Sequence, residues 1–243
     1  MIDCSWTEST CSPAGQSSRD MLIAGVDGCK DGWVIVSETH GGQTAIDVAS
    51  DFQQILRSKC DLIVVDVPIG LLERGTRLAD QEARRLLKGR ACCVFTAPLR
   101  PMLTCLDYLE ARKSRLRIEG KALTKQAWAI MPKIIEVDRL LTSKSQSRVR
   151  EGHPELSFAH LNDGKALALS KHSKEGRQNR IALLTKHFSG IASEVQKHSR
   201  VAQDLIDAYA MLWTARRIRD GGAVALPEHA PRDTHRLLMQ IWA

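Results

Sequence analysis

The stretch DLIVVDVPIGL, residues 61–71, constrains the fold more than any other part of the chain, because its apolar residues follow one another almost without a break. A strand with one face in water alternates apolar and polar residues, whereas a strand buried on both faces does not. A short helix is predicted just before it, over DFQQILRS. We therefore predict a central parallel strand in a sheet that helices cover on both faces.

Three more strands are predicted upstream of this run. LIAGVD and WVIVSE flank the turn GCKDG, as in a β-hairpin, and QTAIDVAS follows a second turn at His40, Gly41 and Gly42. Strands joined by tight turns are antiparallel, whereas a strand reached through a helical crossover is parallel. The predicted fold class is therefore an α/β protein whose mixed sheet has three antiparallel strands followed by parallel ones.

Helical spacing of apolar residues is typical of the middle of the chain. One helix is predicted in LADQEARRLLK, and two more over residues 102–112 and 122–141, separated by the basic stretch ARKSRLRIEGK. Residues 142–150 are expected to form a basic linker that runs into a short strand. Together these elements predict a helical insertion in the sheet.

The C-terminal part is also mainly helical by pattern. We predict a helix that begins at Pro154, helices over residues 176–188 and 201–219, and a last strand in VALP at residues 224–227. We expect a single domain over residues 21–243, preceded by a disordered extension over residues 1–20.

The composition argues against several classes of protein. The first twenty residues are polar and lack the apolar core of a secretory signal, and no run approaches the about 18 apolar residues of a membrane span. Seven cysteines without a CxxC spacing disfavour zinc and favour a reducing, cytoplasmic compartment. A formal charge of +7 favours an anionic partner, such as nucleic acid, a nucleotide or a phosphorylated metabolite.

Two aspartates fall at the ends of predicted neighbouring strands. Asp27 ends LIAGVD and Asp66 ends DLIVVD. Open α/β sheets place their sites at the carboxyl ends of parallel strands, so these two side chains are candidates for one site. The alternative for Asp27 is a residue that only serves the local hydrogen bonds of its turn.

A second acidic motif, DLIDAYA, lies in the helix predicted over residues 201–219. Asp204 and Asp207 are spaced i, i+3 and therefore share one helix face, with Cβ atoms about 5–6 Å apart. An apolar stripe beside them is expected to pack on the sheet; it consists of Leu205, Ala208, Leu212 and Ala215. The alternative is a solvated face in which the helix dipole favours Asp204 near the N-terminus.

If this helix crosses the carboxyl edge of the sheet, the four aspartates converge. Carboxylates gathered without a basic partner raise one another's pKa and destabilise the fold. Two divalent ions about 3.5–4 Å apart would remove that repulsion and position phosphoryl oxygens for in-line displacement. Hard oxygen ligands suit Mg²⁺ or Mn²⁺ and not zinc. The predicted metal ligands and catalytic residues are Asp27, Asp66, Asp204 and Asp207.

The order of these acids, on two strands and then on a final DxxDA helix, resembles the ribonuclease H-like superfamily. The likeness is closest to its RuvC-type resolvases, although those usually carry Glu in place of Asp66. From about Leu22 to Arg219 the chain more specifically resembles the family catalogued as domain of unknown function 429, described as predicted nucleases with a ribonuclease H-like fold. The motifs that carry this likeness are GVDGCKDGW, DVPIGL, DQEARRLLKGR with CVFTAPLR, KIIEVD, EGHPELSF and DLIDAYA.

The motif EGHPELSF adds two candidates to the predicted centre. Glu155 is a candidate metal ligand or general base, an assignment that the family resemblance favours, and His153 is a candidate proton shuttle near neutral pH. The alternative for Glu155 is an exposed glutamate in the first turn of a helix that begins at Pro154.

Several basic residues are candidates for binding a phosphodiester, because arginine forks match phosphate oxygens. For each of them the alternative is a solvated helix face. The uncharged loop between Arg90 and Arg100 is expected to face the substrate. The substrate-binding candidates are Lys30, Arg84, Arg90, Arg100, His153, Lys171 and Arg177.

Three functions are compatible with these patterns. The first is a Mg²⁺- or Mn²⁺-dependent nuclease that hydrolyses DNA, RNA or another phosphodiester by attack of water; the resemblance to resolvases implies a homodimer. The second is a non-catalytic module that binds nucleic acid or protein. The third is an ATP-binding protein of the actin and sugar-kinase type, but the chain offers only one glycine-rich turn for phosphate.

Overall fold

The computed structural model describes residues 21–39 and 42–243, and its strands form a seven-stranded sheet in the order β3-β2-β1-β4-β5-β7-β6. The pairs β1–β2, β2–β3 and β6–β7 are antiparallel, whereas β1, β4, β5 and β7 run parallel. This mixed sheet confirms the predicted fold class; the extension predicted over residues 1–20 lies outside the described residues. The strands are β1 (Ile23–Cys29), β2 (Gly32–Glu38), β3 (Thr44–Ala49), β4 (Leu62–Val65), β5 (Val149–Gly152), β6 (Ala225–Leu226) and β7 (Ile241–Trp242).

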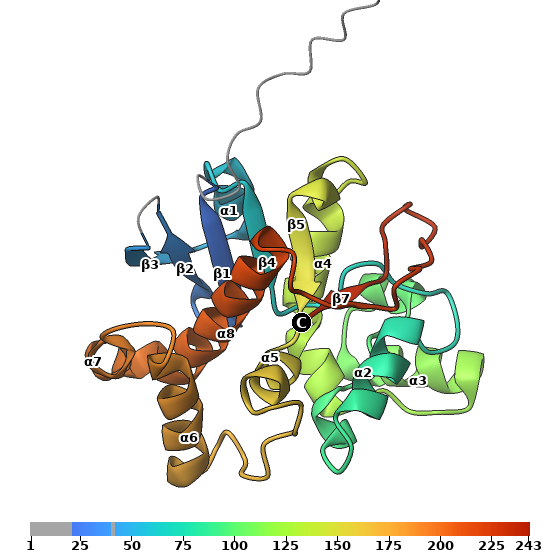
Figure 1. Ribbon diagram of the computed structural model, residues 1–243. Helices are drawn as coiled ribbons and strands as arrows, with labels where there is room; N and C mark the ends of the chain where they lie inside the picture. The colour runs from blue at the N-terminus through green and yellow to red at the C-terminus, as the bar shows by residue number, and fades with distance from the viewer. Residues whose placement is uncertain (1–20, 40–41) are drawn as a thin grey trace, which may run out of the picture.

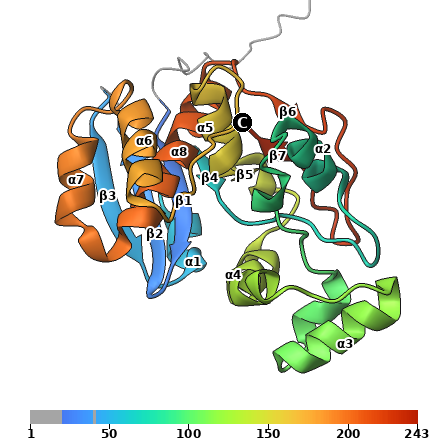
Figure 2. The ribbon, with the colours of Figure 1, turned by 90° about the horizontal axis from the view of Figure 1, so that it is seen from below.

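Helices cover both faces of the sheet, as the apolar run in β4 requires. The helices α5 to α8 lie on one face, and α1 and α4 lie on the other (Figures 1 and 2). Among the described residues, no helix is long and apolar enough to cross a membrane. The helices are α1 (Phe52–Arg57), α2 (Leu78–Leu86), α3 (Tyr108–Glu119), α4 (Lys125–Leu140), α5 (Pro154–Leu161), α6 (Lys174–Thr185), α7 (Ile191–Lys197) and α8 (Ala202–Arg219).

Helix α8 lies directly on β1, and Gly25 is the point of closest approach. A Cβ atom added at Gly25 would lie 2.0 Å from the backbone nitrogen of Leu212 and 2.2 Å from the carbonyl oxygen of Ala208. The stripe predicted to pack on the sheet, which includes both of these helix residues, is fully buried. The absence of a side chain at Gly25 therefore fixes how closely α8 crosses the strand that carries Asp27.

The segment between β4 and β5 contains α2, α3 and α4 and forms the predicted helical insertion. One boundary was predicted wrongly: the basic stretch ARKSRLRIEGK does not separate two helices but makes up most of α3. Its buried positions are Ala111, Ser114 and Arg115, so the helix packs a small and partly polar face that leaves little apolar periodicity in the sequence. Helix α4 begins at a Thr124 cap, whose side chain accepts a hydrogen bond from the amide of Ala127.

The C-terminal part departs from the prediction in three short elements. The predicted linker over residues 142–150 contains a 3-10 helix, η4 (Ser145–Ser147), before β5 begins. Helix α7 and strand β7 were not predicted, whereas the predicted strand in VALP is present as β6. Strand β7 has only two residues and pairs in parallel with β5, far away in the sequence, so no local pattern indicates it.

Candidate functional site

Asp27 and Asp66 are brought together by the parallel pairing of β1 and β4. Val26 pairs with Val65, and the amide of Asp66 donates a hydrogen bond of 3.0 Å to the carbonyl oxygen of Val26. The two aspartates that follow these partners therefore occupy equivalent positions in adjacent strands. Because side chains alternate along a strand, both point to the same face as Gly25, which is the face that α8 covers.

Helix α8 supplies the other two predicted acids. Asp207 is 1% exposed, and Asp204, one turn earlier, is partly exposed. Asp204 lines the same cavity as Asp27 and Asp66, and the charge of Asp207 acts on all three carboxyls. The structure thus gathers the four aspartates that the sequence singles out, from β1, the end of β4 and the first two turns of α8.

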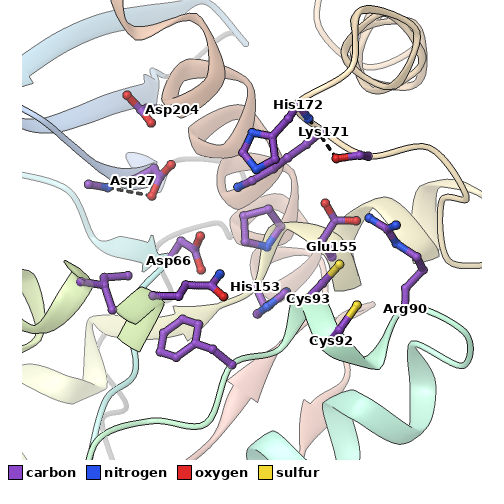
Figure 3. Close-up of a pocket in the computed structure, with 16 residues that line it drawn as sticks. Asp27, Asp66, Arg90, Cys92, Cys93, His153, Glu155, Lys171, His172 and Asp204 are labelled. Carbon is purple, nitrogen blue, oxygen red and sulfur yellow. Dashed lines mark hydrogen bonds between the residues drawn. The ribbon is translucent and has the colours of Figure 1, made fainter. Parts of the chain in front are cut away.

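The expectation that these carboxylates lack a basic partner is wrong. Lys171, from the loop between α5 and α6, extends into the cluster, and its Nζ lies 2.7 Å from Oδ2 of Asp207. The ammonium group also acts electrostatically on Asp27, Asp66 and Asp204. Lys171 was predicted to bind substrate, but its observed partner is an acid of the predicted metal centre. Figure 3 shows it between the acidic side of the cavity and His172.

Burial and mutual repulsion nevertheless raise the pKa of Asp27, Asp66 and Asp204. Burial, with repulsion from Asp66 and Asp207, raises the pKa of Asp27 well above its usual value. Burial raises the pKa of Asp66 to about 7, although Lys171 opposes the shift. Burial, with repulsion from Asp207, raises the pKa of Asp204 to about 6. The cluster therefore carries more negative charge than its surroundings stabilise, which is the electrostatic condition that favours a cation.

The hydrogen bonding of these acids shows which of them have free oxygens. Within the described residues, the carboxylates of Asp66 and Asp204 accept no hydrogen bond, and that of Asp27 accepts only from the adjacent amide of Gly28, at 2.7 Å. In the same part of the chain, no group of three or more His, Cys, Asp or Glu side chains already has the arrangement of a metal site. The free oxygens are hard donors, which is the type of ligand that Mg²⁺ and Mn²⁺ prefer.

The acids open onto a cavity of about 350 Å³ that has two chemically different sides. Asp27, Asp66 and Asp204 lie on one side, whereas Arg90, His153 and Glu155 lie on the other (Figure 3). The remaining lining residues are Gly28, Cys92, Cys93, Phe95, Gln126, Ile130, Pro154, Ser170, Lys171 and His172. An adjoining hollow also contains Asp27 and Asp66 and extends to Lys30, so this candidate lies beside the acids as well.

Glu155 and His153 both line the cavity. The alternative for Glu155, a glutamate exposed to solvent in the first turn of its helix, does not hold because the side chain is buried. It is 7% exposed, and its Oε1 accepts a hydrogen bond of 2.6 Å from Nη2 of Arg180, a side chain with no exposed surface. Burial lowers the pKa of His153, which favours the neutral form of this imidazole. Its Nδ1 is buried and has no hydrogen-bond partner in the described residues.

Of the predicted arginines, only Arg90 lines the cavity, and no ion pair of its guanidinium is present among the described residues. Arg84, in α2, instead binds the loop that follows this helix: it donates hydrogen bonds of 3.0 Å to the carbonyl oxygen of Val94 and of 2.8 Å to Oγ1 of Thr96. Arg177 is exposed on α6, outside the cavity. These positions do not place Arg84 or Arg177 in the site.

Arg100 also lies away from the cavity, where it joins α4 to the segment before β7. Its guanidinium pairs with Asp138 at 2.9 Å and with the fully buried carboxylate of Asp233. Asp233 in turn accepts a hydrogen bond of 3.0 Å from the amide of Leu71, just after β4. Arg100 therefore stabilises the fold next to the central strand and does not face a substrate in the cavity.

Some lining residues were not singled out by the sequence. Cys92, Cys93 and Phe95 belong to the loop predicted to face the substrate, so the segment was identified but not its individual side chains. His172 and Gln126 carry no recognisable motif; only the three-dimensional proximity of their elements places them in the cavity.

One protein-family profile matches the part of the chain that forms this site. The profile of the family described as "Protein of unknown function (DUF429)" matches residues 25–232, a range that contains all four aspartates and Lys171. No match was found among curated proteins or among solved structures. Because the matched range covers most of the sequence, the chain belongs to the DUF429 family of proteins of unknown function.

Proposed function

We propose that this protein is a Mg²⁺- or Mn²⁺-dependent phosphodiesterase that hydrolyses nucleic acid. The observation that carries the proposal is the division of one cavity into an acidic side with free carboxylate oxygens and a side that presents an arginine. A phosphodiester is anionic and needs both a hard cation and a donor for its second oxygen, and these two sides supply the corresponding ligands.

The residues of the chain divide the chemistry between them. Asp27, Asp66 and Asp204 would hold the metal, which when bound supplies Lewis-acid activation of the phosphoryl group and of the attacking water. Arg90 would donate to a non-bridging phosphate oxygen and so orient the substrate. The Glu155 oxygen that does not face Arg180 is the candidate acceptor for the proton of the attacking water, because Glu155 borders the cavity beside these groups.

The size and lining of the cavity support a substrate that enters one unit at a time. About 350 Å³ lies at the lower end of the range of small-ligand sites, about 300–1,000 Å³. Phe95 and Ile130 provide an apolar wall against which a base or sugar can pack, and Gln126 provides a polar contact next to it. We therefore expect single-stranded ends or flipped nucleotides to fit better than an uninterrupted duplex.

A non-catalytic binding module is the second candidate, and the ion pair of Lys171 with Asp207 favours it. This contact neutralises part of the acidic cluster without any metal. A protein that had lost catalysis but kept a basic surface would retain such a pair. Metal binding distinguishes the two candidates, because only the phosphodiesterase requires it.

The decisive experiment is a calorimetric Mn²⁺ titration of the wild type, Asp27→Asn and the control Asp47→Asn. Asp47 is an exposed aspartate of β3 in the same sheet, so its replacement removes an equal charge outside the cavity. We expect saturable binding in the wild type and in Asp47→Asn and its loss in Asp27→Asn. Mn²⁺-dependent cleavage of single-stranded DNA or RNA should follow the same pattern. Absent or Asp27-independent binding would refute the phosphodiesterase and favour the binding module.

A further inference from the structure

Lys171 is held in the acidic cluster by its own loop. The carbonyl oxygen of Leu169 accepts a hydrogen bond of 3.1 Å from Arg180, and that of Ser170 accepts one of 3.0 Å from the amide of Ser173. A Cβ atom added at Gly176 would lie 2.0 Å from the Ser170 oxygen, so the loop packs tightly on the first turn of α6. The backbone on both sides of Lys171 is therefore fixed, and its side chain begins at a defined place beside Asp207.

The ion pair with the buried Asp207 stabilises the Lys171 ammonium group at this place. The Lys171 side chain is 34% exposed, whereas its partner Asp207 is 1% exposed and, within residues 21–39 and 42–243, makes only two long contacts of 3.4 Å, from Nε2 of Gln203, besides this ion pair. Removing the ammonium would leave a buried carboxylate almost without a partner, which is strongly unfavourable.

We propose that Lys171 takes the place of a second divalent ion. The carboxylates of Asp27, Asp66 and Asp204 would then hold one metal ion, and the Lys171 ammonium would remain beside Asp207 as a permanent cation. This inference rests on the metal site proposed above and replaces the two ions expected from the sequence with one. A divalent ion bound to Asp207 would have to displace the ammonium or share a carboxylate with it. Like charges about 4 Å apart repel each other strongly in a partly buried site.

In this arrangement Lys171 is a positioning residue with two consequences. It reduces the negative charge of the centre before any metal binds, and its side chain borders the cavity in which the proposed phosphodiester would lie. The remaining acids, whose oxygens accept few or no hydrogen bonds from the residues that the structure describes, are then the ones available to a single ion.

The number of bound ions tests the inference directly and needs no substrate. We would count Mn²⁺ by calorimetry and by electron paramagnetic resonance, in which two ions in one centre give a spin-coupled spectrum. We expect one ion in the wild type and two in Lys171→Met, where the Asp207 carboxylate becomes available. The matched control is Lys174→Met, an exposed lysine at the start of α6, which should still bind one ion.

Each outcome separates this inference from the proposed function. Two ions in the wild type, or one ion in both the wild type and Lys171→Met, would show a metal site and overturn the role of Lys171. No ion in any variant would refute both the metal site and the inference. If Lys171→Met does not fold, Lys171→Gln tests the same point, because it also removes the charge beside Asp207 and should raise the count to two; one ion in Lys171→Gln would contradict the inference.

Discussion

Asp66 donates its backbone N–H to the carbonyl oxygen of Val26 over 3.0 Å, and this bond aligns the ends of two parallel strands. Since Asp27 follows Val26 directly, the two aspartates lie side by side on the face beneath α8. Their spacing is set by the backbone ladder of the sheet, whereas the position of Asp207 depends on how α8 packs. The candidate site therefore combines a rigid pair of acids with a second pair carried by a helix.

The first prediction concerns the pH dependence of stability. Burial raises the pKa of Asp66 from 3.8 to about 7, so between about pH 4 and pH 7 the native state binds more protons than the unfolded state. The contribution of this carboxyl to stability is therefore greatest at low pH and is lost as the pH rises to about 7. Asp66→Asn should remove this loss and raise the free energy of unfolding at pH 8 by about 1–2 kcal/mol.

Urea denaturation of Asp66→Asn and the wild type at pH 5 and pH 8 measures this effect, with Asp47→Asn as the exposed control. The gain should be present at pH 8 and small at pH 5. If Asp66→Asn is equally or less stable than the wild type at pH 8, the carboxyl is not held in an unfavourable environment. Addition of Mg²⁺ at pH 8 should stabilise the wild type more than Asp66→Asn, because the metal would relieve the same repulsion.

Replacement of Gly25 tests the crossing of α8 over β1. In Gly25→Ala the new methyl group would overlap the backbone of α8, with atoms at 2.0 and 2.2 Å, and backbone cannot move aside as a flexible side chain can. We expect a loss of about 3 kcal/mol or more in the free energy of unfolding. Thermal denaturation would measure it against Gly222→Ala, since a Cβ at Gly222 meets nothing within 4 Å. Equal stability of the two variants would contradict the close approach.

The coupling between the buried side chains of Glu155 and Arg180 can be measured by a double-mutant cycle. Arg180→Met leaves the Glu155 carboxylate buried and uncompensated and should cost about 3–5 kcal/mol. Adding Glu155→Leu should recover part of this loss, because no unpaired charge remains; the bonds of Arg180 to the carbonyls of Leu169 and Gly176 are still missing. The measurement is urea denaturation of both single variants and the double variant. Strictly additive effects would show that the two side chains are not coupled.

The thiols give a simple probe of the cavity. Cys92 is exposed at its border, whereas Cys93 is partly covered and burial raises the pKa of its thiol. Among the five cysteines that the structure describes, alkylation followed by mass spectrometry should therefore modify Cys92 first and the buried Cys29 and Cys60 last. Mn²⁺ together with a non-hydrolysable dinucleotide should slow the reaction of Cys92. An unchanged rate in the presence of a bound ligand would place that ligand elsewhere.

The sheet and the acidic residues could be predicted because their signals are local. The apolar run of β4, the hairpin of β1 and β2 and the DxxD spacing of α8 are all contained within short segments. Helix α3 was placed wrongly because its buried face consists of small and polar residues, and β7 was missed because its pairing with β5 is visible only in three dimensions.

The partners of charged side chains could not be predicted for the same reason. Lys171, Arg84 and Arg100 all read as cations available to a phosphate, yet each is bound to groups of its own chain. An arginine or lysine has the same local signature whether it faces solvent, a substrate or a buried carboxylate. Only the folded arrangement decides among these, as the pairing of Arg100 with Asp233 demonstrates.

The crossing of α8 over β1 also has a consequence for biosynthesis. Asp27 and the apolar face of β1 leave the ribosome well before α8, the helix that covers them (Figure 1). Until α8 emerges, the nascent chain exposes Ile23 and Val64 together with unneutralised acids, and such uncovered strands are prone to aggregation. The face of the sheet that carries Asp27 and Asp66 therefore stays uncovered until α8 has been made, and the four aspartates can come together only after that.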